Sequence, residues 1–207
     1  MKPEHAEAWR KAVIAYANGP SKLTAVFDRA LSKKSLSLTG VNARTDDATL
    51  RSVESIYRTT WWPAHREANR QLRARLDELV AKHGRSILTF ITAKYGMERP
   101  HGGYPIHICA YANWAGAYST SDGLLVVSSM VNWDRLNELE IVFHEAMHQW
   151  DEDMAKLLGR NAPRDLSHAL IFYTAGEAVR RIDPTYQPYA ETAGIWQRGM
   201  GPLRVLL

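Results

Sequence analysis

The stretch VFHEAMHQW, residues 142–150, constrains this chain most strongly, because it sets two histidines and a glutamate among mainly uncharged residues. Histidines four residues apart lie above one another on one face of an α-helix, so His144 and His148 can direct ring nitrogens at one point. Buried imidazoles and a buried carboxylate need partners, which a metal ion supplies. The spacing predicts a Zn²⁺ site with Glu145 beside the metal and not bound to it. The alternative is a pair of core histidines satisfied by hydrogen bonds.

The chemistry of this motif predicts hydrolysis. Zinc lowers the pKa of a bound water and polarises a carbonyl group. Glu145 could then act as general base and acid, taking a proton from the attacking water and passing it to the leaving amine. The sequence therefore indicates a zinc metallopeptidase that acts on a peptide or protein substrate.

At HEAMH the sequence resembles the zincin metallopeptidases, whose active-site helix carries HExxH. The resemblance extends more weakly over residues 104–190 and is nearest to the thermolysin-like group, the gluzincins. It implies an α+β catalytic core in which the edge strand of a small mixed sheet binds the substrate main chain. The stretch YANWAGAYS (111–119) is similar to that edge strand, so Asn113, Trp114 and Ala115 would line the cleft. The alternative is an ordinary aromatic-rich hairpin.

A catalytic zinc needs a third protein ligand and one open position for water. The metzincin pattern would place a glycine and a histidine where this chain has Asp151 and Met154, which excludes that subfamily. The third ligand must come from a later element, and His168 and Glu177 are the candidates. They lie nine residues apart. At about 100° per residue they face opposite ways on a regular helix, so only one can serve the metal.

The helix faces favour His168 over Glu177. His168 shares a stripe that is almost wholly apolar and should pack on the body of the protein: Ile171, Phe172, Ala175, Val179 and Ile182. Glu177 is followed by Arg180 and Arg181 at salt-bridge spacing, which indicates a surface ion pair. The family resemblance supports Glu177 instead, because gluzincins use a glutamate on the next helix, so Glu177 stays as the alternative ligand.

Three further residues are candidates for supporting roles. Asp151 lies one turn beyond His148 and could orient its imidazole, or it is a solvated member of an acidic run. Tyr186 and Tyr189 could donate a hydrogen bond to the tetrahedral intermediate, as Tyr or His does in zincins, or they are packing residues.

Hydrophobic periodicity predicts a single α+β domain over residues 1–207, with a helical part at 1–95. The resemblance to zincins implies a zincin-like catalytic core at 96–207. Asp134 is expected to cap a long helix over 136–158, and Asp165 or Ser167 to cap another that runs to Ile182. The apolar tail should pack back on the body. The remaining segments expected are helices at 4–17, after a break at 18–21 to about Leu31, from 46 or 47 to 61, at 64–83 with Gly84 as its stop, and at 86–95, and strands at 105–112 and 123–130.

Composition limits partners and compartment. The net charge is +4, but no basic stripe interleaved with aromatics stands out, so we expect no nucleic-acid partner. The single cysteine, Cys109, excludes an internal disulfide. The start shows no signal-peptide core and no run reaches membrane-spanning length, so we expect a cytoplasmic protein, or an exported one without its leader.

Two other functions fit the sequence. One is a zinc-binding protein of zincin fold that does not cleave peptides. The other is a DNA-associated protease of the SprT-like kind, although such proteins usually carry a cysteine-rich zinc ribbon that one cysteine cannot form. Substrate preference and oligomeric state stay open at this level.

Overall fold

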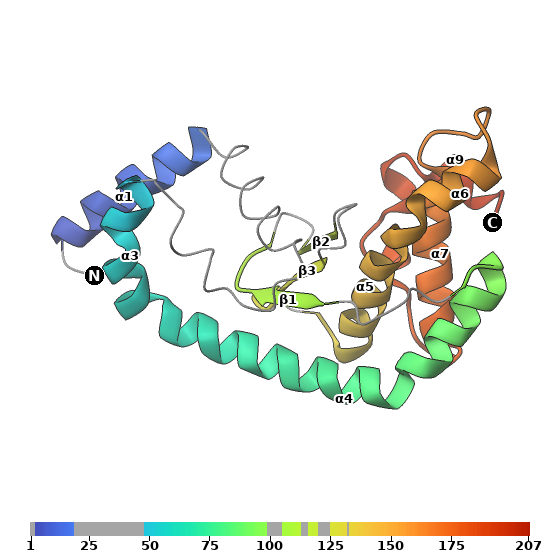
Figure 1. The fold of residues 1–207 in the computed structure, drawn as a ribbon, viewed down its shortest axis with the longest axis horizontal. Coiled ribbons are helices and arrows are strands. Elements are labelled where there is room, and N and C mark those ends of the chain that lie inside the picture. Colours follow the sequence, from blue (N-terminus) through green and yellow to red (C-terminus); the bar gives the residue numbers. More distant parts are fainter. Residues whose placement is uncertain (1–2, 19–47, 99–104, 113–115, 120–124, 132) are drawn as a thin grey trace.

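A computed structural model describes residues 3–18, 48–98, 105–112, 116–119, 125–131 and 133–207 of the chain. One long helix, α4 (Trp62–Tyr95), runs along the molecule (Figure 1). Helices α1 (Pro3–Asn18) and α3 (Ala48–Thr60) pack together near its start. The C-terminal helices lie near its other end. None of the described helices has the length and apolarity needed to cross a membrane. The short helix expected between the break at 18–21 and Leu31 lies outside the described residues.

Helix α4 corrects the prediction of two helices separated at Gly84. The chain stays helical through Gly84 and ends at Gly96, which has φ 62° and donates its N–H to the carbonyl of Thr92. Gly84 is buried, and the ring of Phe143 on helix α5 (Arg135–Met147) packs over it. The glycine therefore marks a close helix contact, where the loss of a side chain costs only about 1 kcal/mol of helix propensity.

The predicted break at Trp62-Pro63 is confirmed. Helix α3 ends at Thr60, and α4 begins at Trp62 with the proline in its first turn. Proline fits there because the first N–H groups of a helix need no partner within it.

A small mixed sheet follows α4, which confirms the α+β class. It contains β1 (Ile106–Cys109), β2 (Ala117–Ser119) and β3 (Leu125–Ser128) in the order β1-β3-β2. Strand β3 lies at the centre, parallel to β1 and antiparallel to β2. The two predicted strands are thus present in shorter form, and YANWAGAYS ends in an edge strand.

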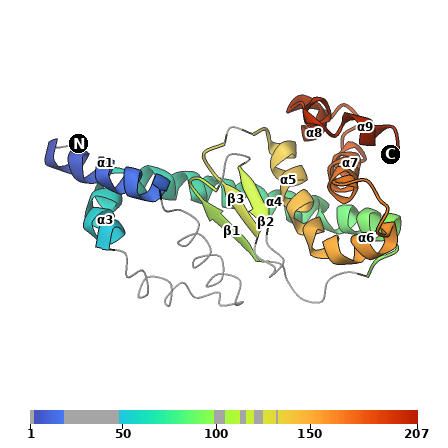
Figure 2. The same cartoon turned by 90° about the horizontal axis from the view of Figure 1, so that it is seen from above.

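Helices α4 and α5 (Arg135–Met147) cover the same face of this sheet. Their buried side chains share one hydrophobic cluster with the sheet: Leu72, Leu76, Ile106, Ile108, Ala117, Leu125, Val127, Ile141 and Val142. A second cluster joins the later part of α4 to α5 and to α7 (Leu166–Arg180) through Ile87, Ile91, Phe143 and Ile171. Figure 2 shows the sheet beside α4 and α5. The helical residues before 96 therefore contribute directly to the core that carries the HEAMH segment.

The continuous helix predicted over 136–158 is wrong. Helix α5 ends at Met147, a 3-10 turn covers His148–Trp150, and α6 covers Asp151–Leu158. The cap and the stop were predicted correctly. The Asp134 carboxylate accepts hydrogen bonds from the N–H groups of Leu136 and Asn137 (2.9 and 2.8 Å), and Gly159 follows α6.

The C-terminal elements pack around α7 (Leu166–Arg180). Asp165 occupies the N-cap position, as predicted, but its φ is 65° and its side chain makes no capping hydrogen bond. Ser167, the alternative cap, lies within the helix. The short elements α8 (Tyr189–Thr192), η3 (Trp196–Arg198) and α9 (Gly201–Arg204) follow. Leu203 and Trp196 pack with Phe172 of α7, which confirms that the tail returns to the body.

An ion pair between α4 and α5 should support this arrangement. The Arg75 guanidinium donates to both carboxylate oxygens of Glu138 (2.6 to 3.0 Å), and Glu138 is only 3% exposed. Arg75→Met should lower the free energy of unfolding by about 2–4 kcal/mol, because it leaves a buried carboxylate unpaired. Arg73→Met is the matched control, because the ion pair that Arg73 makes with Asp77 is long, at 3.5 Å, and exposed. Urea denaturation of both variants measures the difference, and equal stabilities would contradict this role.

Candidate metal centre

Three imidazoles from two helices converge at one point. His144 and His148 come from the last turn of α5 and the residue after it, and His168 comes from the first turn of α7. Their ligand atoms all lie within 4.8 Å of one another, so the group could hold a metal ion. The Nε2 atoms of His144 and His168 are 3.2 Å apart. Two nitrogens at about 2.05 Å from a tetrahedral zinc would lie about 3.3 Å apart.

The three rings form a nearly equilateral triangle. The ring centroids of His144, His148 and His168 are separated by 5.1 to 5.2 Å. Phe172, one turn after His168, packs against His144 at 4.2 Å and stacks on His168 at 4.7 Å. The phenyl ring therefore forms an apolar wall that fixes two of the imidazoles and excludes water from that side.

Burial keeps the innermost imidazole in the form that binds metals. His144 is 3% exposed, and desolvation together with the neighbouring His148 and His168 holds its pKa well below the usual value. Desolvation and His148 lower the pKa of His168 as well. A neutral imidazole is the ligand form. Among the described residues, the Nδ1 atom of His144 is buried and has no hydrogen-bond partner.

His148 is oriented from its other nitrogen. Its Nδ1 lies 2.9 Å from the Asp151 carboxylate. The 3-10 turn at His148–Trp150 explains this contact, because residues three apart eclipse one another in that geometry. Burial opposes protonation of His148, but the hydrogen bond and charge of Asp151 outweigh it and raise the pKa. A proton on Nδ1 facing Asp151 leaves Nε2 as the nitrogen available to a metal.

Glu145 lies between the histidines and the edge strand. It is 6% exposed, and burial raises the pKa of its carboxyl group, while a hydrogen bond with Ser119 of β2 acts in the opposite direction. A raised carboxyl pKa suits a group that accepts and returns a proton. Sequence reasoning missed Ser119, although its place at the end of YANWAGAYS next to the predicted cleft residues was the available signal.

The alternative ligand Glu177 is engaged elsewhere. Its carboxylate accepts from Arg180 at 2.7 Å, and Arg180 also contacts Glu191 at 3.1 Å. The surface ion pair expected from the sequence is therefore present. No contact in the described part of the chain brings Glu177 to the three histidines.

Tyr186 and Tyr189 bind a buried carboxylate one turn before His144. The Tyr186 hydroxyl donates to Glu140 and accepts from Asn137, each at 2.5 Å, and the Tyr189 N–H donates to Glu140 at 3.0 Å. Neither tyrosine is brought to the histidines by a contact among the described residues. The candidate cleft residues Asn113, Trp114 and Ala115 lie outside the described residues.

Glu140 should make stability depend on pH. Desolvation raises the pKa of this carboxyl group to about 7, from an ordinary value of 4.5. A group whose pKa is raised on folding stabilises the fold below its unfolded pKa, and this contribution is lost as pH rises through the folded pKa. Between pH 4.5 and 7 the loss should reach roughly 3 kcal/mol. Glu140→Gln should remove this slope.

Urea denaturation at intervals from pH 4.5 to 8, with a chelator present, measures the effect. The difference between wild type and the variant isolates Glu140 from the histidines, which titrate equally in both proteins. Parallel stability curves would contradict the assignment.

No protein-family model matches this sequence, and comparison with curated proteins and with solved structures gave no match. The interpretation of the site therefore depends on its geometry. Its donor set of three imidazoles is one that zinc accepts, with a fourth position left for water.

Proposed function

We propose that this protein is a zinc-dependent peptidase. His144, His148 and His168 hold the metal, and Glu145 is the general base and acid. The observation that carries the proposal is the convergence of three imidazoles with ligand atoms within 4.8 Å, beside a buried glutamate that contacts an edge strand. Catalytic zinc sites combine three protein ligands with an open position for water.

The protein's own groups divide the work of hydrolysis. Bound zinc supplies a water of lowered pKa and a positive charge for the carbonyl oxygen. Glu145 accepts the proton of the attacking water and delivers it to the departing amine, which its buried position and raised pKa favour. Asp151 holds the His148 ring in place through Nδ1. Phe172 keeps one side of the site dry.

The substrate would bind along β2. This strand is an edge of the sheet, and its Ser119 lies against Glu145. An extended peptide added alongside β2 gains main-chain hydrogen bonds and brings a carbonyl carbon toward the glutamate. This geometry favours unfolded or extended segments as substrates.

Metal analysis combined with a cleavage assay tests the proposal. The purified protein should contain one zinc per chain and should cleave an unfolded protein such as reduced casein. A chelator should abolish cleavage, and added zinc should restore it. Stoichiometric zinc with no cleavage of casein or of a mixed peptide library would indicate a zinc-binding protein without turnover. A native protein that binds no zinc would overturn the proposal.

A further inference from the structure

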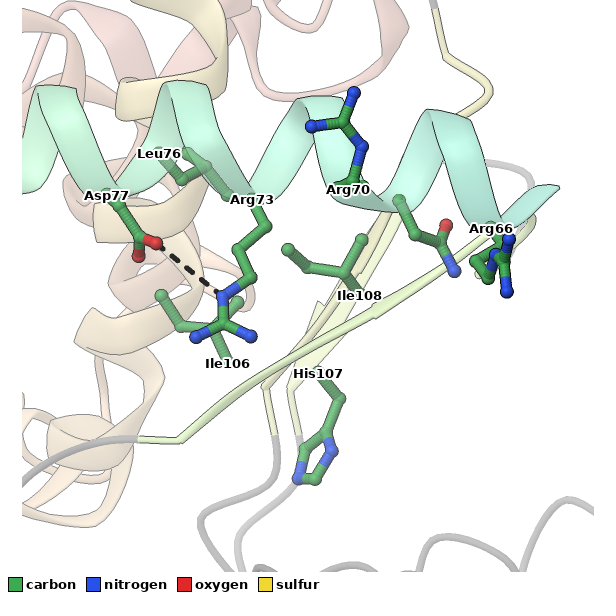
Figure 3. Close-up of a pocket in the computed structure, with 9 residues that line it drawn as sticks. Arg66, Arg70, Arg73, Leu76, Asp77, Ile106, His107 and Ile108 are labelled. Atoms are coloured by element: carbon green, nitrogen blue, oxygen red, sulfur yellow. Dashed lines mark ion pairs between the residues drawn. The ribbon is translucent and has the colours of Figure 1, made fainter. Parts of the chain in front are cut away.

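A cleft lies at the edge of the sheet opposite to β2. This cleft, of about 640 Å³, separates the first half of α4 from β1. Figure 3 shows α4 crossing β1, with Ile106 and Ile108 between them and arginine side chains along the helix. The lining consists of Arg66, Asn69, Arg70, Arg73, Leu76, Asp77, Ile106, His107 and Ile108. All of these residues belong to the described part of the chain.

The arginines form one row on α4. Arg66, Arg70 and Arg73 have the spacing i, i+4 and i+7, which places them on one helix face. At 1.5 Å per residue, the row extends about 10 Å along the helix axis. Leu76 packs in the hydrophobic cluster of the sheet, and Figure 3 shows the Arg73 side chain directed toward β1 and the Arg70 side chain directed away from it.

The row has more positive charge than its neighbours neutralise. Arg70 pairs with Glu67 at 2.7 Å, and Arg73 makes a longer 3.5 Å contact with Asp77. Arg66 makes no ion pair with any described residue. The side chains of Arg70 and Arg73 are 70% and 77% exposed, so their guanidinium groups can turn toward a ligand. The charged residues that line the cleft are three arginines and one aspartate.

The floor of the cleft is the outer edge of β1. Strand β1 pairs with β3 on its inner side, and no described strand pairs with its outer side. The Cys109 carbonyl accepts from the N–H of Ser129 at 2.8 Å, so the main chain of Cys109 faces the β3 side. Because main-chain groups alternate along a strand, those of Ile106 and Ile108 face outward into the cleft.

We propose that this cleft binds an extended acidic peptide segment, which adds to the outer edge of β1 and places its carboxylates against Arg66, Arg70 and Arg73. Residues on one face of a strand recur about every 6.7 Å, so two or three alternating acidic residues cover about 7 to 13 Å. The arginine row has a matching length of about 10 Å. Main-chain pairing supplies affinity, and the arginines select for acidic side chains.

The lining favours a peptide over a nucleic acid. Single-stranded nucleic acids bind where aromatic side chains stack on bases along a basic groove. The only ring in the lining belongs to His107, which points away from α4 in Figure 3. An unpaired strand edge, in contrast, is a template for another strand. The site does not depend on the zinc chemistry, and its occupant would be held at the edge opposite the proposed substrate strand.

Fluorescence anisotropy tests this inference directly. The probe is a labelled octapeptide of alternating valine and glutamate, measured with full-length protein carrying Glu145→Gln so that cleavage does not interfere. R66Q/R70Q/R73Q should weaken binding by about 8- to 125-fold, since each exposed charge contact contributes about two- to fivefold. The charge-matched control is R160Q/R164Q/R198Q, which removes three exposed arginines elsewhere and should change affinity less than twofold.

Three comparisons complete the test. A valine–lysine octapeptide should not bind, and raising the salt concentration should weaken the acidic probe. N-methylation of alternate amides in the acidic probe should weaken it at least tenfold, because strand pairing is blocked. Equal loss in both triple variants, no effect of N-methylation, or tighter binding of a ten-nucleotide oligothymidine through the same arginines would each overturn the proposal. Because binding is measured without catalysis, these outcomes are independent of peptidase activity.

Discussion

Glu145→Gln is expected to lower kcat/KM for peptide hydrolysis by about 10²- to 10⁴-fold, the range that a general base contributes. The glutamine amide has nearly the same shape and can keep the contact with Ser119 of β2. It cannot accept a proton at neutral pH. The three histidines are untouched, so zinc content should stay at one per chain.

Glu152→Gln provides the control for Glu145→Gln. Glu152 is an exposed carboxylate in the first turn of α6, close in sequence to the site, and its loss should leave kcat/KM within a factor of two. Hydrolysis of casein and metal analysis on the same preparations give both readouts. Full activity in Glu145→Gln would remove this residue from the mechanism. Loss of zinc in that variant would mean that Glu145 acts on the metal site itself.

The HEAMH segment could be interpreted from the sequence because its geometry is local. Four-residue spacing on a helix brings His144 and His148 together wherever that helix lies. The cap at Asp134 is local in the same sense, since a side chain reaches only the next few N–H groups. The 3-10 turn after Met147 was not predictable from apolar periodicity, because nearly the same apolar spacing fits both kinds of helix.

Features that depend on contacts between residues distant in the sequence were harder to predict from the sequence. Glycine is a common helix stop, but α4 continues through Gly84, which lies buried beside Phe143 of another helix. The structure was also needed to decide that Asp151 orients His148, because the residues of an acidic run are ordinarily solvated. Its approach to His148 depends on the 3-10 geometry.

The arginine row on α4 was not identified from the sequence, and the reason is different. Arg66, Arg70 and Arg73 are separated in the sequence and do not form a run of adjacent charges. On a helix they lie on one face, and the neighbouring strand makes that face one wall of a cleft. Counting charges at helical spacing within the predicted helix 64–83 would have revealed the row. Its position beside β1 could not be inferred without the tertiary structure.

Substitution of His168, the proposed third zinc ligand, should have the second large effect, a loss of zinc affinity. His168→Ala should weaken zinc binding by more than the 10- to 100-fold that loss of an outer-shell partner costs, because a direct ligand is removed. Glu177→Ala should keep zinc at one per chain, since this carboxylate is paired with Arg180 at 2.7 Å. Competition with a chromophoric chelator measures both affinities. Because Ala also removes the stacking on Phe172, His168→Gln serves as a second variant of closer size.

Thermal unfolding separates loss of zinc from loss of packing. A ligand that binds only the folded state stabilises it by about 4 kcal/mol when its concentration is 1,000 times its Kd. Added zinc should therefore raise the melting temperature of wild type and Glu177→Ala much more than that of His168→Ala and His168→Gln. The opposite pattern, with zinc retained in both His168 variants and lost in Glu177→Ala, would move the third ligand to the other face of α7. That outcome would require α7 to turn by about half a revolution, because residues nine apart lie on opposite faces of a helix.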